Sequence, residues 1–151
     1  MDMLEERVMD WLVQNQGAFV APQYHLYGGA SADRKPWAVP DFVALDFKKK
    51  VVFVVEVSAA DQTGGLLENV RNREDRWFQK LRAQLQTAEI SDDIWQFKVL
   101  LFLRKKEAET FRKRFADVGD VIIRSLEEIA NYWEWDWPSE KAAKEVAGKE
   151  H

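Results

Sequence analysis

The chain has 151 residues, 46% of them hydrophobic and 32% charged, a balance that predicts one globular domain and excludes a disordered or membrane-spanning chain. It has no cysteine, no apolar leader after Met1 and no apolar run approaching the ~20 residues of a transmembrane helix, so we expect a cytoplasmic protein. The net charge of −4 is uneven: the last 26 residues hold seven acids and three bases, which leaves 19 of each in the rest. An acidic tail on a neutral body weakens a nucleic-acid interpretation without removing it, because local patches decide phosphate contact.

The N-terminal half is predicted to form a helix and three strands. Apolar residues at helical spacing predict a helix over 2–15, ended by Gly17, and loose alternation predicts a strand over 18–27. Two further strands, 41–47 and 51–58, are joined by three lysines. This connection is short enough to predict an antiparallel hairpin.

The rest of the chain alternates helices with strands. A helix over 66–86 has the strongest apolar face, and it is followed by a strand over 97–103, a helix over 107–116, a strand over 121–123 and a last helix capped by Ser125. The predicted fold class is α/β, a central mixed and largely antiparallel sheet flanked by helices, in the order α-β-β-β-α-β-α-β-α. We expect a single domain over 1–137 and a charged, flexible tail over 138–151.

Two carboxylates interrupt the hairpin where its pattern favours apolar residues. Asp41 follows Pro40 at the start of one strand, and Glu56 lies between valines at the end of the next. A two-residue turn places Asp41 opposite Glu56 and a three-residue turn places it opposite Val57, so the two acids are neighbours in either register, since opposed Cβ atoms lie about 4.5–5.5 Å apart. Because desolvating an unpaired carboxylate costs several kcal/mol, this pair predicts a metal site. Structural roles stay open: a turn residue for Asp41, and a strand end or a buried arginine partner for Glu56.

Pro40-Asp41 followed by Glu56-Val57-Ser58, on this order of elements, resembles the PD-(D/E)XK nuclease superfamily, which has the restriction-endonuclease-like fold. The resemblance covers residues 1–105. It implies that Asp41 and Glu56 bind Mg²⁺ or Mn²⁺ and that the Val57 carbonyl completes the metal shell. An acid of the first helix is also implied near the site, and Glu5, at the edge of the apolar face, is the geometric choice.

Ser58 occupies the position of the lysine that orients or activates water in that superfamily. Serine is neither a cation nor a base near neutral pH, so the 66–86 helix would have to supply the basic group. Lys80 is chemically the closest substitute, with Arg73 and Arg76 as alternatives. Glu74 projects near the middle of the apolar face of this helix, where we expect it to pair with Arg71 or with an arginine from another element.

The resemblance implies a metal-dependent nuclease, an endonuclease or exonuclease that hydrolyses phosphodiester bonds in DNA. The alternatives are a catalytically degenerate nuclease-fold module that binds nucleic acid or protein, and an unrelated interaction domain whose tryptophan-rich end is the working surface. A homodimer through Trp133–Trp137 is also expected, because tryptophan is enriched in such contacts. The residues expected to contact nucleic acid are Arg34, Lys35, Arg73, Arg76 and Lys80.

Overall fold

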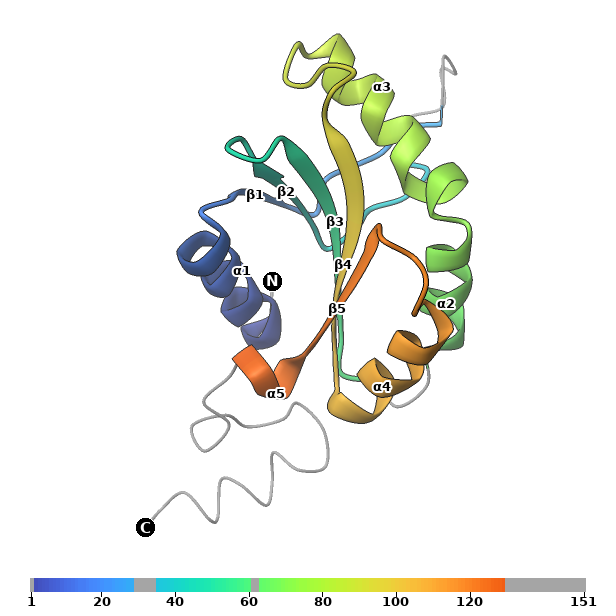
Figure 1. The fold of residues 1–151 in the computed structure, drawn as a ribbon. Coiled ribbons are helices and arrows are strands. Elements are labelled where there is room, and N and C mark those ends of the chain that lie inside the picture. The colour runs from blue at the N-terminus through green and yellow to red at the C-terminus, as the bar shows by residue number, and fades with distance from the viewer. Residues whose placement is uncertain (1, 29–34, 61–62, 130–151) are drawn as a thin grey trace.

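A mixed five-stranded sheet forms the centre of the computed structural model, which describes residues 2–28, 35–60 and 63–129 (Figure 1). The strands lie in chain order: β1 (Phe19–Pro22), β2 (Phe42–Asp46), β3 (Val51–Ser58), β4 (Gln96–Leu103) and β5 (Val121–Ser125). The pairs β1–β2 and β2–β3 are antiparallel, whereas β3–β4 and β4–β5 are parallel. The α/β class and the mixed sheet are confirmed. The sheet is only half antiparallel, because helical connections allow the last two strands to return parallel.

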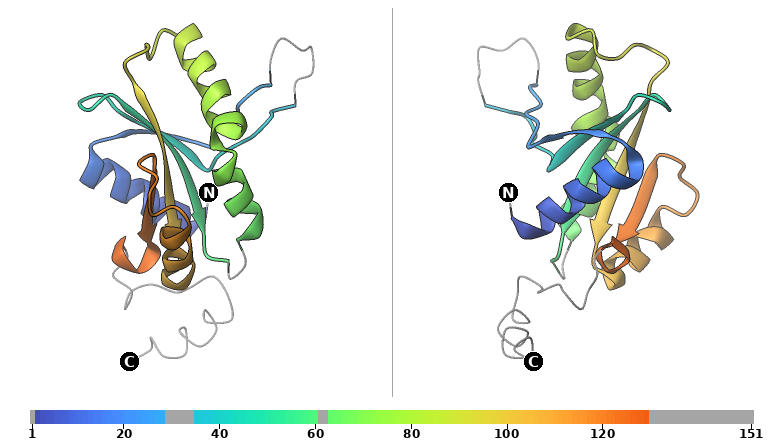
Figure 2. Two further views of the ribbon diagram at one scale, coloured as in Figure 1. Left: turned by 45° about the vertical axis from the view of Figure 1, so that its right-hand side comes forward. Right: turned by 90° about the vertical axis from the view of Figure 1, so that its left-hand side faces the viewer.

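Helices cover both faces of this sheet (Figure 2). One face carries α1 (Met3–Gln16) and the short α5 (Leu126–Ile129), and the other carries α2 (Gly64–Arg71), α3 (Gln79–Thr87) and α4 (Lys105–Arg114). None of the helices in the described ranges has the length and apolar character needed to cross a membrane. The sheet is therefore the middle layer of three.

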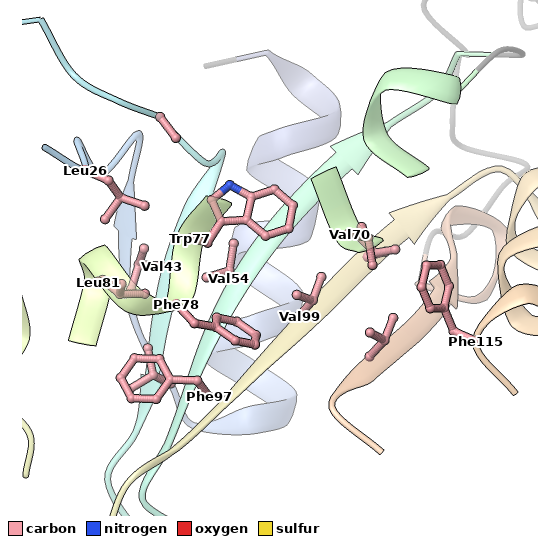
Figure 3. Close-up of a cluster of buried hydrophobic side chains, with 14 of the residues drawn as sticks. Leu26, Val43, Val54, Val70, Trp77, Phe78, Leu81, Phe97, Val99 and Phe115 are labelled. Atoms are coloured by element: carbon pink, nitrogen blue, oxygen red, sulfur yellow. The ribbon is translucent and has the colours of Figure 1, made fainter. Parts of the chain in front are cut away.

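Alternating strand residues build a separate core on each face. Val54 and Leu101 belong to the core beneath α2, α3 and α4, where Trp77 is 1% exposed (Figure 3). Val55 and Leu100, one position away on the same strands, belong to the core beneath α1 and α5. This period of two, in strands buried on both sides, explains why β3 and β4 read as continuous apolar runs.

The ends of the N-terminal elements follow local chemistry. Asp2 accepts a hydrogen bond from the Glu5 N–H at 2.8 Å and begins α1, and Gly17 ends it in the left-handed conformation, with φ of 60°. The strand predicted over 18–27 is shorter, because Pro22 lacks an N–H and Gln23 turns the chain at φ of 50°. Among the described residues after β1, antiparallel pairing resumes at an isolated bridge between Leu26 and Ala38.

The helix predicted over 66–86 contains a π-helical segment. Residues Glu74–Phe78 form this π-turn between α2 and α3. The extra residue in the turn rotates the side chains before it relative to those after it. Glu74 consequently lies at the surface with a side chain 64% exposed, so its predicted place on the apolar face is wrong. It does pair with an arginine, as predicted, but the partner is Arg82 of α3 at 3.0 Å and not Arg71.

Candidate active site

The hairpin brings Asp41 and Glu56 together at one edge of the sheet. Its register runs from Phe42 opposite Val55 to Asp46 opposite Val51, and one further step places Asp41 opposite Glu56. This is the first of the two predicted registers, although the loop spans four residues and Asp46 accepts hydrogen bonds from the N–H groups of Lys48 and Lys49. The acids lie where the parallel strands β3 and β4 end, the edge at which α/β proteins commonly bind ligands.

The two acids face the same side of the sheet. Val43 and Val54, each two residues from one of the acids, belong to the core beneath α2 and α3. Because strand side chains alternate, Asp41 and Glu56 point toward that face as well. The helix that follows β3 therefore covers the pair.

The two carboxyl groups share a hydrogen bond, and their pKa values are displaced. Burial first, and then the charge of Asp41 and its hydrogen bond, raise the pKa of Glu56 to about 9. Burial also raises the pKa of Asp41, against the hydrogen bonds that it accepts from the Val57 N–H, at 2.8 Å, and from Glu56. At neutral pH Glu56 is consequently protonated, and one proton lies between the two groups.

Arg76 lies close enough to Glu56 for their charges to interact. Its charge lowers the pKa of Glu56, against the larger effect of burial. The Arg76 Nε is buried and has no hydrogen-bond partner within the described part of the chain. A buried donor without a partner is costly, so this atom is suited to an acceptor such as a phosphate oxygen or an ionised Glu56.

Two side chains donate hydrogen bonds to carbonyl groups of the π-turn and so fix the backbone position of Arg76. The Trp37 indole Nε1 donates to the Arg76 carbonyl at 2.9 Å, and the Lys80 ammonium donates to the Asp75 carbonyl at 3.0 Å. The Lys80 Nζ also lies 4.1 Å from the centre of the Trp37 ring. Trp37 was not predicted as a site residue, and its position in a loop before Pro40 carries no signal of this contact.

The remaining predicted site residues lie in several environments. The Glu5 carboxylate accepts from the Asp2 N–H at 3.4 Å, and its pKa is raised mainly by burial and, to a smaller extent, by the charges of Asp2 and Asp41. The first helix therefore places an acid close enough to Asp41 for their charges to interact. The Ser58 hydroxyl accepts a hydrogen bond from the Ala60 N–H at 3.2 Å.

The residues predicted to contact nucleic acid do not all lie in one place. Arg73 binds Asp120 through Nε at 2.6 Å and Nη2 at 2.9 Å, which directs its guanidinium toward the start of β5. Lys35 is exposed, and Arg34 and the predicted dimer segment Trp133–Trp137 lie outside the described residues. Arg76 and Lys80 are the members of this set that lie around Trp37.

The donor set at the edge of the sheet suits a hard cation. Within residues 2–28, 35–60 and 63–129, no three Asp, Glu, His or Cys side chains form a group that could hold a metal ion. Two adjacent carboxyl groups are nevertheless sufficient for Mg²⁺, which is commonly bound through one or two carboxylates, several waters and substrate phosphates. A cation at this position would replace the shared proton and relieve the repulsion between the two acids.

Comparisons of the chain with protein-family models, with curated proteins and with solved structures found no match.

Proposed function

We propose that the protein is a metal-dependent nuclease that hydrolyses phosphodiester bonds in DNA, with Mg²⁺ or Mn²⁺ as its cofactor. The observation that carries this proposal is the position of Asp41 opposite Glu56 at the end of the hairpin, where an Asp41 oxygen accepts the Val57 N–H at 2.8 Å. The charge of Arg76, whose Nε is buried and has no partner among the described residues, acts on Glu56. Neighbouring buried acids with displaced pKa values are typical of functional sites. The restriction-endonuclease-like fold, a cytoplasmic location and a dimer through Trp133–Trp137 belong to the same proposal.

Each residue at the site has a defined task in this reaction. Asp41 and Glu56 would hold the cation, which supplies charge neutralisation and a more acidic bound water. The Val57 N–H fixes the orientation of the Asp41 carboxylate. Arg76 would donate from Nε to a phosphate oxygen, and this bond strengthens as negative charge develops on the phosphate. Lys80 stays the proposed basic group in place of the lysine that Ser58 replaces.

The test is cleavage of duplex, branched and single-stranded DNA in the presence of Mn²⁺. We expect the wild-type protein to cleave at least one of these forms. Asp41→Asn and Glu56→Gln should each lower the rate by about a hundredfold or more, since each removes a ligand that supports several kcal/mol of charge stabilisation. Glu68→Gln, the same change at an exposed side chain of α2, is the matched control and should cleave like wild type.

Two results would reject the nuclease. The first is cleavage that persists in both ligand variants, which would point to a contaminating enzyme. The second is a protein that binds neither Mn²⁺, measured by calorimetry, nor any of the three DNA forms.

A degenerate, non-hydrolytic module is the second candidate, and two observations favour it. The hydroxyl of Ser58 is bonded to its own loop, and one Asp41 oxygen already accepts the Val57 N–H. Binding of DNA that is unchanged by EDTA and by Asp41→Ala, without cleavage by the wild-type protein, would support this module. Mn²⁺-dependent cleavage by wild type would eliminate it.

A further inference from the structure

A pocket of about 650 Å³ lies between α3 and the loop residues 24–28. Its walls include Tyr24 and Tyr27 on one side and Ala83 and Thr87 on the other. Gln84 joins the two sides, because its amide accepts from the Tyr27 N–H at 2.7 Å and donates to the His25 carbonyl at 3.1 Å. This volume lies within the range of small-ligand sites in proteins.

The lining combines tyrosine rings with polar groups that can form hydrogen bonds to the edge of a bound heterocycle. Tyr27 is 43% exposed, and its hydroxyl lies 3.4 Å from the His25 Nδ1. Gln79 adds an exposed amide at the rim. Flat aromatic walls with amide donors and acceptors fit a heterocyclic base better than an aliphatic chain.

The charge at the rim favours an anionic ligand. Lys80 lines the pocket, and no carboxylate is found among the described residues of its lining. A second pocket of similar volume carries three glutamates, Glu107, Glu109 and Glu127, beside three cations, Arg104, Lys105 and Lys106, so its charges offset one another. The first pocket, whose described lining has Lys80 and no acid, therefore complements a base attached to a phosphate backbone.

Trp37 connects this pocket to the carboxyl pair. Its ring contacts Lys80 at the rim, and its indole N–H binds the carbonyl of Arg76, whose charge acts on Glu56. Gly28, which also lines the pocket, lies close to Trp37, since a Cβ added at Gly28 would be 3.7 Å from the ring. Arg76 and the pocket residue Lys80 thus both contact Trp37 from one helical segment, whereas Asp41 and Glu56 come from the hairpin.

We infer that this pocket holds an unpaired nucleobase of the DNA strand that the carboxyl pair cleaves. The inference rests on the proposed function and narrows its substrate to DNA with unpaired bases: single strands, frayed ends or flaps. Tyr27 stacks on the base, and Lys80 neutralises a neighbouring phosphate. A base within a duplex cannot enter the pocket without leaving its stack, which disfavours fully paired DNA.

The test is the affinity of the protein for a fluorescent single-stranded oligodeoxynucleotide of about ten residues, measured by anisotropy in EDTA so that no cleavage occurs. We expect Ala83→Trp, which fills the pocket from α3, and Tyr27→Ala each to weaken binding about tenfold or more. Tyr27→Phe keeps the ring and should bind like wild type. Gln86→Trp is the matched control, because it adds the same ring at an exposed position of α3 that does not line the pocket.

The outcomes separate the pocket from the catalytic proposal. Unchanged binding of the oligodeoxynucleotide by Ala83→Trp and Tyr27→Ala would overturn the inference, and so would equal affinity of wild type for a closed hairpin duplex. Mn²⁺-dependent cleavage by wild type alongside either result would leave the nuclease standing without the base pocket. Pocket-dependent binding without cleavage would support the pocket and reject the nuclease.

Discussion

At the scale of single residues, Asp41 and Glu56 illustrate a conflict between stability and binding. Two acids at adjacent positions of a hairpin repel each other when both are ionised, and burial strengthens the repulsion. The folded protein avoids this cost by keeping Glu56 protonated. Under the proposed function, the same arrangement would let a cation replace this proton, a common compromise between stability and binding at functional sites.

The stability of the protein should consequently fall as the pH rises. The pKa of Glu56 is about 9 in the folded protein against 4.5 as its ordinary value, so between these values the folded state holds a proton that the unfolded state has lost. The free energy of unfolding then decreases with pH, by up to about 1.4 kcal/mol per pH unit, and this contribution levels off above the folded pKa. Glu56→Gln keeps a donor toward Asp41 without titrating. Urea denaturation at about pH 5 and pH 8 should show the variant gaining stability over wild type at the higher pH; parallel curves for the two proteins would contradict the shared proton.

At the scale of elements, the π-turn determines which side chains of the helical segment 64–87 face the sheet and which face solvent. An uninterrupted α-helix would place Glu74 on the buried face, since it lies four residues after Val70 and four before Phe78. The wider turn moves Glu74 into solvent, and the carbonyl groups of this turn accept hydrogen bonds from Trp37 and Lys80. The interaction of the Arg76 charge with Glu56 therefore depends on the helix as a whole.

The pair between Arg73 and Asp120 fastens this helix to the loop before β5. Two hydrogen bonds join the guanidinium to the carboxylate, and the Arg73 side chain is 20% exposed. We expect Asp120→Ala to lower the free energy of unfolding by about 1 kcal/mol, because the pair is bidentate but partly screened by solvent. Asp117→Ala, an exposed acid of the same loop, should change stability by less than about 0.5 kcal/mol. Equal effects of the two changes, measured by urea denaturation, would show that the ion pair does not fasten the helix.

At the scale of the whole molecule, the sheet is stabilised by cores on both faces. Leu101 of β4 is fully buried against α2, α3 and α4, whereas its neighbour Leu100 packs toward α1 and α5. Loss of either side chain leaves a cavity in a close-packed layer. Neither core can therefore be weakened without loosening the strand that both share.

Leu101→Ala should destabilise the protein by about 2–5 kcal/mol, from lost burial and the cavity that remains. Val13→Ala, at a position of α1 that is 51% exposed, should change the free energy of unfolding by less than about 0.5 kcal/mol. Chemical denaturation monitored by tryptophan fluorescence measures both. A Leu101→Ala loss as small as that of Val13→Ala would mean that the core beneath α2 and α3 repacks around the missing side chain.

Local patterns alone determined much of this molecule. The bounds of β3, the end of α1 at Gly17 and the hairpin that makes Asp41 and Glu56 neighbours follow from alternation, a left-handed glycine and a short connection, which are all properties of neighbouring residues. The sequence left two registers open, and the structure has the one that sets Asp41 opposite Glu56. For this reason the sequence predicted the α/β class, the hairpin and the meeting of the two acids.

Only the tertiary structure decided how the site is completed. The hydrogen bond from Trp37 to Arg76 joins residues 39 positions apart, and the one from Tyr27 to Gln84 joins residues 57 apart, so no local pattern encodes either contact. The π-turn, the parallel pairing of β4 and β5 and the pocket beside α3 likewise depend on how distant segments pack. The sequence therefore predicted that Asp41 and Glu56 meet. Long-range packing determined that the charge of Arg76 acts on Glu56 and that Lys80 lies against Trp37, because burial and charge at a site are set by every segment that surrounds it.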